Sequence, residues 1–592
     1  MSKYLLQSIY IKPQWVPDPN AAPGQFAMKK IADDVLIEVI KDDETNSSSL
    51  RLIERPTIEF YTIIDEANCN PYNEMYIDKD KVETHVVEYS KRDIEICKYL
   101  GIENEYKQLK ANMNKRYPTW EQAVAARDEF NNFMNEKVYK SPYIYGASVT
   151  IEEFYKSKFM LENGNATPKV MNLSFYDIET FIYAYKEKVD QNNPLAPINV
   201  ITYYNTKFNH FFCLVLELPD TPDVKDVKAN LDEYIREYIS EDFTDMKDVK
   251  LNFEFFESEV MMMRRFMNLI HTDKPDIAYA WNDNYDKKYI MGRMQHYGLN
   301  ISEEWCHPDI PEQYRRFQFI EFADRKAANP FVKKGKKAKT DTSRYWDKTL
   351  CPGYTLFVDQ MSLYSNLRKR GLERSYKLDA IAEKVIGANK VDLHEFGLTI
   401  RNAPVKNFKL FLKYSCRDTK LLAKIEEKDN DSVNYLMLTD NSDFWNGVNV
   451  SIVIKNMYYM YMLEHNMVIG NTVDYGVEES IEGAVVQDTE LLDVKPLTIN
   501  GKRTKIYRMV ADYDAKSLYP SLMNQGKIGK ENQKYRILQI VDEHNKYIMN
   551  GAEFNSALQT SDVSIVELCN RIYNLPKTVD VLKDFERMMM GA

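Results

Sequence analysis

The chain has 592 residues, which is enough for about three to five domains of ordinary size. Its 78 Lys and Arg residues are outnumbered by 89 Asp and Glu residues, and the formal net charge is -11. This balance excludes a general polycation that coats nucleic acid, so contacts with phosphates must come from local basic patches. The seven cysteines are scattered without a Cys-x-x-Cys pair, which indicates reduced thiols and argues against a zinc site.

The beginning of the chain carries no targeting signal that we recognise. Its apolar stretch is interrupted by Gln7 and Lys12, so a signal peptide is not expected. No run of the sequence reaches the roughly 18 apolar residues of a spanning helix. We therefore expect a cytoplasmic protein with no membrane partner, in the host cell cytoplasm if a phage encodes it.

Residues 1–165 alternate strand-like runs with amphipathic helical ones. Val35–Ile40 and Thr57–Ile64 predict strands, and Thr119–Phe133 predicts a helix. This region contains no motif that points to chemistry. We expect it to form an N-terminal domain.

The next region, residues 166–430, opens with a strand that ends in carboxylates. The apolar run Val170–Tyr176 leads into Asp177 and Glu179. Because side chains alternate along a strand, residues two apart point to the same face. Two carboxylates on one face can bind a hard divalent cation, and oxygen ligands of this kind suit Mg²⁺ or Mn²⁺ rather than zinc.

Two later segments of the same region also present carboxylates. In Pro275–Ile290, a strand-like run is followed by Asn282 and Asp286 and then by a helical pattern. In Asn407–Lys428, apolar residues recur at helical spacing, and Tyr414 and Asp418 share one helix face because they are four residues apart. Further strand-like runs at Ile198–Tyr204 and Phe211–Leu218 precede these segments. The pattern predicts an α/β domain, a mixed sheet flanked by helices with carboxylates gathered at its ends.

A basic segment, Arg325–Lys348, separates the second and third of these carboxylate segments. We call its lysines the basic loop: Lys333, Lys334, Lys336, Lys337 and Lys339. Two interpretations are open. The segment is either a solvated surface loop or a phosphate-binding element whose DNA affinity depends on salt.

Residues 431–472 have a helical pattern, as in Ser451–Asn466, and residues 473–592 begin a new region with a turn at Gly501. Within that last region, Met509–Asn524 reads MVADYDAKSLYPSLMN. A strand-like run there ends in Asp514, which is followed by Ser-Leu-Tyr-Pro-Ser. The Met261–Met263 cluster and the stripe Tyr458–Met462 are expected to be core.

These motifs and their order resemble family B DNA polymerases, in particular the replicative enzymes of T-even-like phages. Asp-x-Glu, Asn-x-x-x-Asp and Tyr-x-x-x-Asp resemble the three exonuclease motifs of the proofreading domain. The resemblance implies an RNase H-like 3′-5′ exonuclease domain with two Mg²⁺ or Mn²⁺ ions in its active site. By this resemblance, the metal ligands are Asp177, Glu179, Asp286 and Asp418, and Tyr414 orients the attacking water. The residues that contact DNA are Asn282 and those of the basic loop. Family members carry a β-hairpin at the position of the basic loop.

Asp514 and the residues after it resemble motif A of the polymerase palm. The resemblance implies that Asp514 binds catalytic metal and that the incoming dNTP is bound by Ala515, Ser517, Leu518 and Tyr519. It further implies an α/β (α+β) multidomain organisation: an N-terminal domain at 1–165, the exonuclease domain at 166–430, a helical return to the N-terminal domain at 431–472, and a partial palm at 473–592.

Two motifs expected of such a polymerase do not follow Asn524. They are the fingers helix with Lys-x-x-x-Asn-Ser-x-Tyr-Gly and the Tyr-x-Asp-Thr-Asp turn that supplies further carboxylates. Asp514 alone cannot hold the two cations that nucleotidyl transfer requires. We therefore expect polymerase activity on primer-template DNA and dNTPs only with a second chain, whether the enzyme is naturally split or truncated, and a sliding clamp reached through that chain. The alternatives are a stand-alone 3′-5′ exonuclease and a catalytically silent, DNA-binding polymerase relic.

Overall fold

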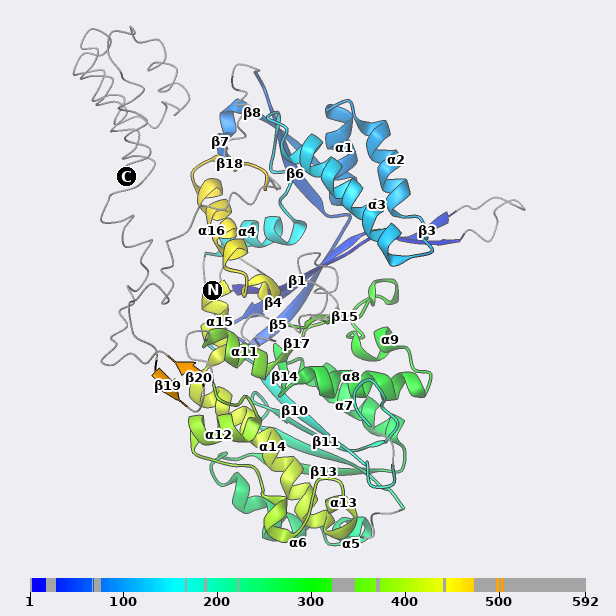
Figure 1. Cartoon of the computed structure of the whole chain (residues 1–592), viewed down its shortest axis with the longest axis vertical. Coiled ribbons are helices and arrows are strands. Elements are labelled where there is room, and N and C mark those ends of the chain that lie inside the picture. Colours follow the sequence, from blue (N-terminus) through cyan, green and yellow to red (C-terminus); the bar gives the residue numbers. More distant parts are fainter. Residues whose placement is uncertain are drawn as a thin grey trace, which may run out of the picture. The chain divides into compact units, whose positions relative to one another are not determined.

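Figure 1 shows the computed structural model of the chain, which divides into two units, Met1–Gly476 and Val477–Ala592. The structure describes residues 3–17, 28–65, 68, 76–164, 168–185, 189–219, 221, 223–321, 346–368, 373–439, 443–472, 497–499 and 502–504. In the second unit these residues form an antiparallel hairpin of β19 (Leu497–Ile499) and β20 (Lys502–Thr504). All further elements belong to the first unit.

The N-terminal part of the first unit contains two three-stranded antiparallel sheets. One has the order β1-β4-β5 and the other the order β8-β6-β9. Their strands are β1 (Lys3–Ile11), β4 (Val35–Asp42), β5 (Ser47–Glu54), β6 (Thr57–Ile63), β8 (Val82–Glu88) and β9 (Ile144–Tyr145), and β2 (Gln14–Pro17) pairs with β3 (Met28–Ala32).

Four helices accompany these sheets, and the sequence explains where two of them begin. They are α1 (Arg92–Tyr99), α2 (Glu103–Met113), α3 (Trp120–Phe133) and α4 (Ile151–Asn163). The Thr119 side chain accepts a hydrogen bond from the backbone N–H of Gln122 at the start of α3. At the start of α4, Thr150 and Glu153 bond to each other's backbone N–H, a reciprocal cap that satisfies two otherwise free donors.

A six-stranded mixed sheet follows, in the order β13-β12-β11-β10-β14-β17. Its strands are β10 (Leu173–Thr180), β11 (Ile198–Asn205), β12 (His210–Leu216), β13 (Lys250–Phe256), β14 (Ile277–Ala280) and β17 (Leu356–Asp359). β11 is antiparallel to both its neighbours, whereas the β10–β14, β14–β17 and β12–β13 pairs are parallel. The expected α/β fold class is thereby confirmed, and the mixed sheet agrees with an RNase H-like domain.

Helices cover both faces of this sheet. Phe175 of β10 packs in one core cluster with Leu422 of α14 (Phe408–Asp429) and Ile381 of α12 (Leu378–Ile386). Tyr176, the next residue, packs on the other face with Phe266 of α7 (Glu259–Asp273), and α8 (Asp283–His296) joins that cluster. Alternate residues of β10 therefore point to opposite helical layers.

Shorter elements connect these layers. They are α5 (Asp223–Ala229), α6 (Leu231–Tyr234), α9 (Ile301–Trp305), α11 (Gln360–Leu367), α13 (Ala403–Lys406) and α15 (Asp431–Thr439). The strands β15 (Gln318–Ile320) and β16 (Lys348–Leu350) pair antiparallel. The five lysines of the basic loop lie between them in sequence but outside the described residues.

After the sheet domain, the chain pairs again with the N-terminal part. Following α16 (Val450–Glu464), strand β18 (Met467–Ile469) lies antiparallel to β7 (Tyr76–Asp78). Asn471 continues this contact, because its side chain accepts a hydrogen bond from Ala147 N at 2.8 Å and donates one to Ile144 O at 2.8 Å. The chain segments that precede and follow the sheet domain in sequence therefore contact each other in the N-terminal part.

A buried ion pair also joins the N-terminal part to the six-stranded sheet. Lys41 of β4 and Asp276, which directly precedes β14, are 2.6 Å apart and almost fully buried. Asp276 also accepts hydrogen bonds from the Ser48 hydroxyl at 2.6 Å and from Asn172 N at 2.8 Å. Because the carboxylate has several partners, its burial is well compensated.

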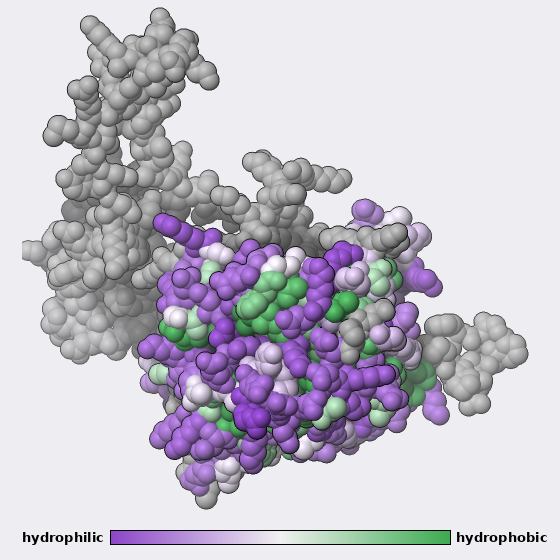
Figure 2. Space-filling model, turned by 90° about the horizontal axis from the view of Figure 1, so that it is seen from below, coloured by the Kyte–Doolittle hydropathy of each residue, from purple (hydrophilic) through white to green (hydrophobic). Residues whose placement is uncertain are grey.

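On the face shown in Figure 2, hydrophilic residues predominate among the described residues and hydrophobic ones form areas of limited size. Such apolar areas are normal on protein surfaces. Within the described parts of the chain, none of the helices combines the length and the apolar character needed to cross a bilayer.

Candidate active site

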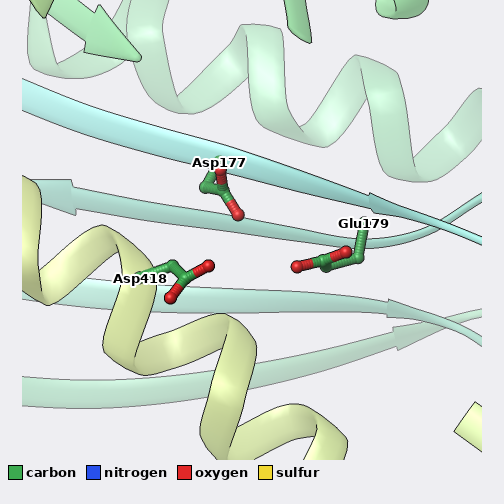
Figure 3. A group of neighbouring side chains, drawn as sticks. All are labelled: Asp177, Glu179 and Asp418. Carbon is green, nitrogen blue, oxygen red and sulfur yellow. The ribbon is translucent and has the colours of Figure 1, made fainter. Parts of the chain in front are cut away.

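Three carboxylates meet between β10 and α14 (Figure 3). They belong to Asp177, Glu179 and Asp418, and each offers an oxygen that lies within 4.8 Å of an oxygen from both of the others. Asp418 is only 2 % exposed. These are three of the four carboxylates that the exonuclease motifs predict to be metal ligands.

Local structure explains why these three side chains converge. Asp177 and Glu179 have the same strand parity as Phe175, so they face α14. Asn407 begins α14 by accepting a hydrogen bond from Leu410 N at 3.0 Å. The hydroxyls of Thr202 and Thr419 are 2.6 Å apart, and Thr202 is the β11 residue paired with Asp177. This contact fixes α14 on the sheet beside the catalytic strand.

Crowding and burial strongly favour the protonated form of this cluster when no cation is present. Burial, followed by the charge of Asp418, raises the pKa of Asp177 to about 7. Burial and then Asp177 and Asp418 raise the pKa of Glu179 well above its usual value. Burial also raises the pKa of Asp418. Three carboxylates held this close form a strong site for a positive charge.

Lys390 supplies part of that charge, and the sequence analysis did not identify it. Its Nζ donates a hydrogen bond to Asp418 Oδ2 at 2.6 Å and lies 3.4 Å from the hydroxyl of Tyr414. Burial by itself lowers the pKa of Lys390, but the negative charges of Asp418 and Asp177 have a larger effect in the opposite direction, so the lysine pKa is raised. The residue lies outside any helix or strand, so neither strand nor helical periodicity could have revealed it.

Tyr414 lies beside the same carboxylates, one helical turn before Asp418. Burial and the charges of Asp418, Glu179 and Asp177 raise the pKa of its hydroxyl. The phenol therefore keeps its proton and can act as a hydrogen-bond donor to an oxygen placed near the cluster.

Asp286, the fourth predicted ligand of the exonuclease motifs, stands apart from this group. It is 4 % exposed, in the first turn of α8, and does not belong to the three-carboxylate group. After burial, the largest influence that raises its pKa is the charge of Asp177, so the two groups are close enough to interact. Asn282 is exposed at the start of the same helix, in a left-handed conformation with φ of 66°.

Two cavities open beside Lys390 and Asp379. One, of about 640 Å³, is lined by Trp281, Asn282 and Tyr376 among others. The other, of about 990 Å³, runs along α14 past Tyr414 and Arg417 and has the exposed Phe396 on its opposite wall. Lys390, whose Nζ is bonded to Asp418, lines both cavities.

The donor set fits a hard divalent cation. All three residues offer carboxylate oxygens, which are the ligands that Mg²⁺ and Mn²⁺ prefer. Asp418 Oδ1 is buried and has no hydrogen-bond partner among the described residues, although Oδ2 is bonded to Lys390. A buried carboxylate oxygen without a partner is costly, and a bound cation removes that cost.

The predicted palm residues lie outside the described part of the chain. This applies to Asp514, Ala515, Ser517, Leu518 and Tyr519. The site described above therefore consists of residues from the exonuclease motifs.

Comparison with known families supports the nuclease assignment. No curated protein matches the chain. The match to a family model covers residues 131–381, a range that includes β10 and the start of α8 and ends before Lys390 and Asp418. That model describes the exonuclease domain of DNA polymerase family B, and residues 131–381 of the chain are similar to it.

Proposed function

We propose that the first unit is a two-metal 3′-5′ proofreading exonuclease, with residues 166–430 as the nuclease domain and DNA as the substrate. The observation that carries the proposal is the cluster of three carboxylates, Asp177, Glu179 and Asp418. The first two lie within the residues that match the exonuclease-domain model. The unpartnered Asp418 Oδ1 supports a cation there.

In this proposal Asp177, Glu179, Asp286 and Asp418 hold two Mg²⁺ or Mn²⁺ ions. When bound, the ions supply the Lewis acidity that phosphodiester hydrolysis needs. Tyr414 donates its phenolic proton in a hydrogen bond that orients the attacking water. Lys390 fixes Asp418 by its 2.6 Å hydrogen bond and brings positive charge next to the scissile phosphate.

The two cavities give the substrate a route. Hydrolysis needs room for DNA on both sides of the scissile phosphate. Lys390 lines both cavities, so both lie next to the residue that is bonded to Asp418. The ring of Tyr376 in the smaller cavity offers a stacking surface for a base, and the exposed Asn282 also lines this cavity. Stacking of this kind tolerates any sequence, as proofreading requires.

The test is degradation of 3′-labelled single-stranded DNA by the whole chain in Mn²⁺. We expect nucleotides to be removed from the 3′ end, and the double variant Asp177→Ala, Glu179→Ala to lose cleavage while keeping its circular dichroism spectrum. Asp232→Ala with Glu233→Ala, which removes two exposed carboxylates of α6, is the matched control and should cleave normally. Cleavage by the first double variant would contradict the proposal. DNA binding without cleavage by the wild type would favour the polymerase relic.

We further propose that residues 473–592 carry part of the palm of a family B polymerase. The support is the motif A resemblance at Asp514 and Tyr519. Asp514 provides one side of a metal site, so nucleotidyl transfer also needs the fingers and the remaining carboxylates, which have to come from polypeptide outside residues 1–592.

Primer extension tests this second proposal. The chain alone should not extend a primer, and extension should appear when a chain with the fingers and the Tyr-x-Asp-Thr-Asp turn is added. Asp514→Asn should abolish extension and spare the exonuclease, which serves as the internal control. Extension by the isolated chain would contradict the need for a partner, and extension by an Asp514→Asn complex would contradict the role of that residue.

A further inference from the structure

Asp359 joins the ends of two neighbouring strands at the edge of the active site. It is the last residue of β17 and is paired in register with Ala280, the last residue of β14. Its Oδ1 accepts hydrogen bonds from Asn282 N at 2.9 Å and from Met361 N at 3.1 Å. Its Oδ2 accepts one from the Ser362 hydroxyl at 2.6 Å.

The bond to Asn282 acts on a left-handed turn. Asn282 has φ of 66° and ψ of 51°, a conformation that is uncommon outside glycine, although asparagine adopts it more readily than most residues. Its carbonyl accepts a hydrogen bond from Tyr285 N at 2.8 Å, in the first turn of α8. Asp286 is the next residue, so the turn at Asn282 begins the helix that carries this carboxylate.

The carboxylate of Asp359 is a strong acceptor at neutral pH. Burial raises its pKa to about 6, against the hydrogen bonds from Ser362 and from the Asn282 N–H, which favour the charged form. The Met361 contact has an ordinary role as the N-terminal cap of α11, but capping of α11 does not account for the bond to Asn282.

We propose that Asp359 is a positioning residue of the nuclease, which fixes the left-handed turn at Asn282 and thereby directs Asp286 toward Asp177. The inference rests on the proposed function, because it gives Asp286 the role of a metal ligand. In this proposal Asp359 acts through the backbone of Asn282.

Two substitutions separate this role from helix capping. Asp359→Ser keeps a hydroxyl that can cap α11, but its side chain is one atom shorter and loses the Oδ1 that accepts the hydrogen bond from Asn282 N. Asp359→Asn keeps an Oδ1 acceptor for both N–H groups and loses the charge. Ser362→Ala removes the third hydrogen bond to the same carboxylate and leaves the contact with Asn282 intact, so it is the matched control.

The primary measurement is Mn²⁺ binding to the whole chain by calorimetry without DNA, and exonuclease kcat and KM follow. Loss of a residue that orients a metal ligand typically weakens metal binding about 10-fold to 100-fold, and this is the loss expected for Asp359→Ser. Asp359→Asn and Ser362→Ala should bind Mn²⁺ nearly as the wild type does. Asn282→Gly in the Asp359→Ser background should recover part of the lost affinity, because glycine adopts positive φ freely.

Melting temperatures and circular dichroism establish that each variant is folded. Wild-type Mn²⁺ affinity in Asp359→Ser would overturn the proposal. An equal loss in Asp359→Asn would also overturn it, because the charge and not the hydrogen bond to the turn would then be responsible. If the wild type binds Mn²⁺ but degrades no DNA, the proposed nuclease function fails, while the binding measurements still decide the role of Asp359.

Discussion

Without divalent cations, the carboxylate cluster should lower the stability of the protein as the pH rises. The pKa of Asp177 is raised from 3.8 to about 7, first by burial and then by Asp418. Between these values the folded state holds a proton that the unfolded state has released, so the free energy of unfolding falls with increasing pH. At ~1.4 kcal/mol for each pKa unit, the complete loss from this group is about 4 kcal/mol. Glu179 adds a loss of the same sign.

Asp177→Asn isolates this contribution, because the amide has the same shape and does not titrate. Relative to the wild type in EDTA, the variant should gain little stability near pH 4 and up to about 4 kcal/mol near pH 8. Mn²⁺ should stabilise the wild type increasingly with pH, since it binds the deprotonated carboxylates that the fold brings together. The same stabilisation should be absent or much smaller in the variant.

The assay is urea unfolding followed by circular dichroism across a pH series, with EDTA and with Mn²⁺. Asp232→Asn, which changes an exposed carboxylate of α6, controls for the loss of one charge. A stability difference between Asp177→Asn and wild type that stays constant over the whole pH series would refute the reasoning. So would an equal Mn²⁺ effect in both proteins.

Three further predictions concern other contacts. Lys390→Met should sharply reduce exonuclease kcat and leave the fold intact, because Asp418 loses its 2.6 Å ion pair, and unchanged kcat would contradict this role. Replacing all five lysines of the basic loop with Ser should weaken the salt dependence of DNA binding. The slope of log binding constant against log salt concentration should fall in magnitude by about 0.7 for each single-strand phosphate that is no longer neutralised. An unchanged slope would indicate a solvated loop. Lys41→Met should cost about 3–5 kcal/mol of unfolding free energy, since it leaves the buried Asp276 charge without its cation. The exposed Lys30→Met is the control for this measurement, and an equal cost in both would contradict the argument.

The sequence predicted the cluster well where regular periodicity governs side-chain direction. Asp177 and Glu179 share a face because side chains alternate along a strand. Asp418 meets them from α14, which runs from Phe408 to Asp429 and so begins one residue after the start of the expected helical segment at Asn407. Lys390 and Asp359 were missed for the opposite reason. Lys390 lies outside regular elements, and the importance of Asp359 depends on a contact with Asn282, which is 77 positions away in sequence.

The predicted core residues were only partly correct, because helix geometry spreads consecutive residues around the axis. Met262 and Met263 are fully buried, as expected, but Met261 is 58 % exposed. In the stripe on α16, Tyr459, Met460 and Met462 are buried, whereas Tyr458 and Tyr461 are about half exposed. Apolar composition alone does not show which side of a helix is covered, since that depends on packing partners distant in sequence.

The pairing of β7 with β18 has a consequence for the order in which the chain folds during synthesis. Ile77 pairs with Val468, roughly 390 residues later, so the ribosome must complete the whole nuclease before this strand pair can close. At translation rates of about 5–20 residues per second, the wait is roughly 20–80 s. The nuclease is therefore expected to fold while β7 still lacks its partner, and the exposed strand edge is a point where the nascent chain can pair wrongly.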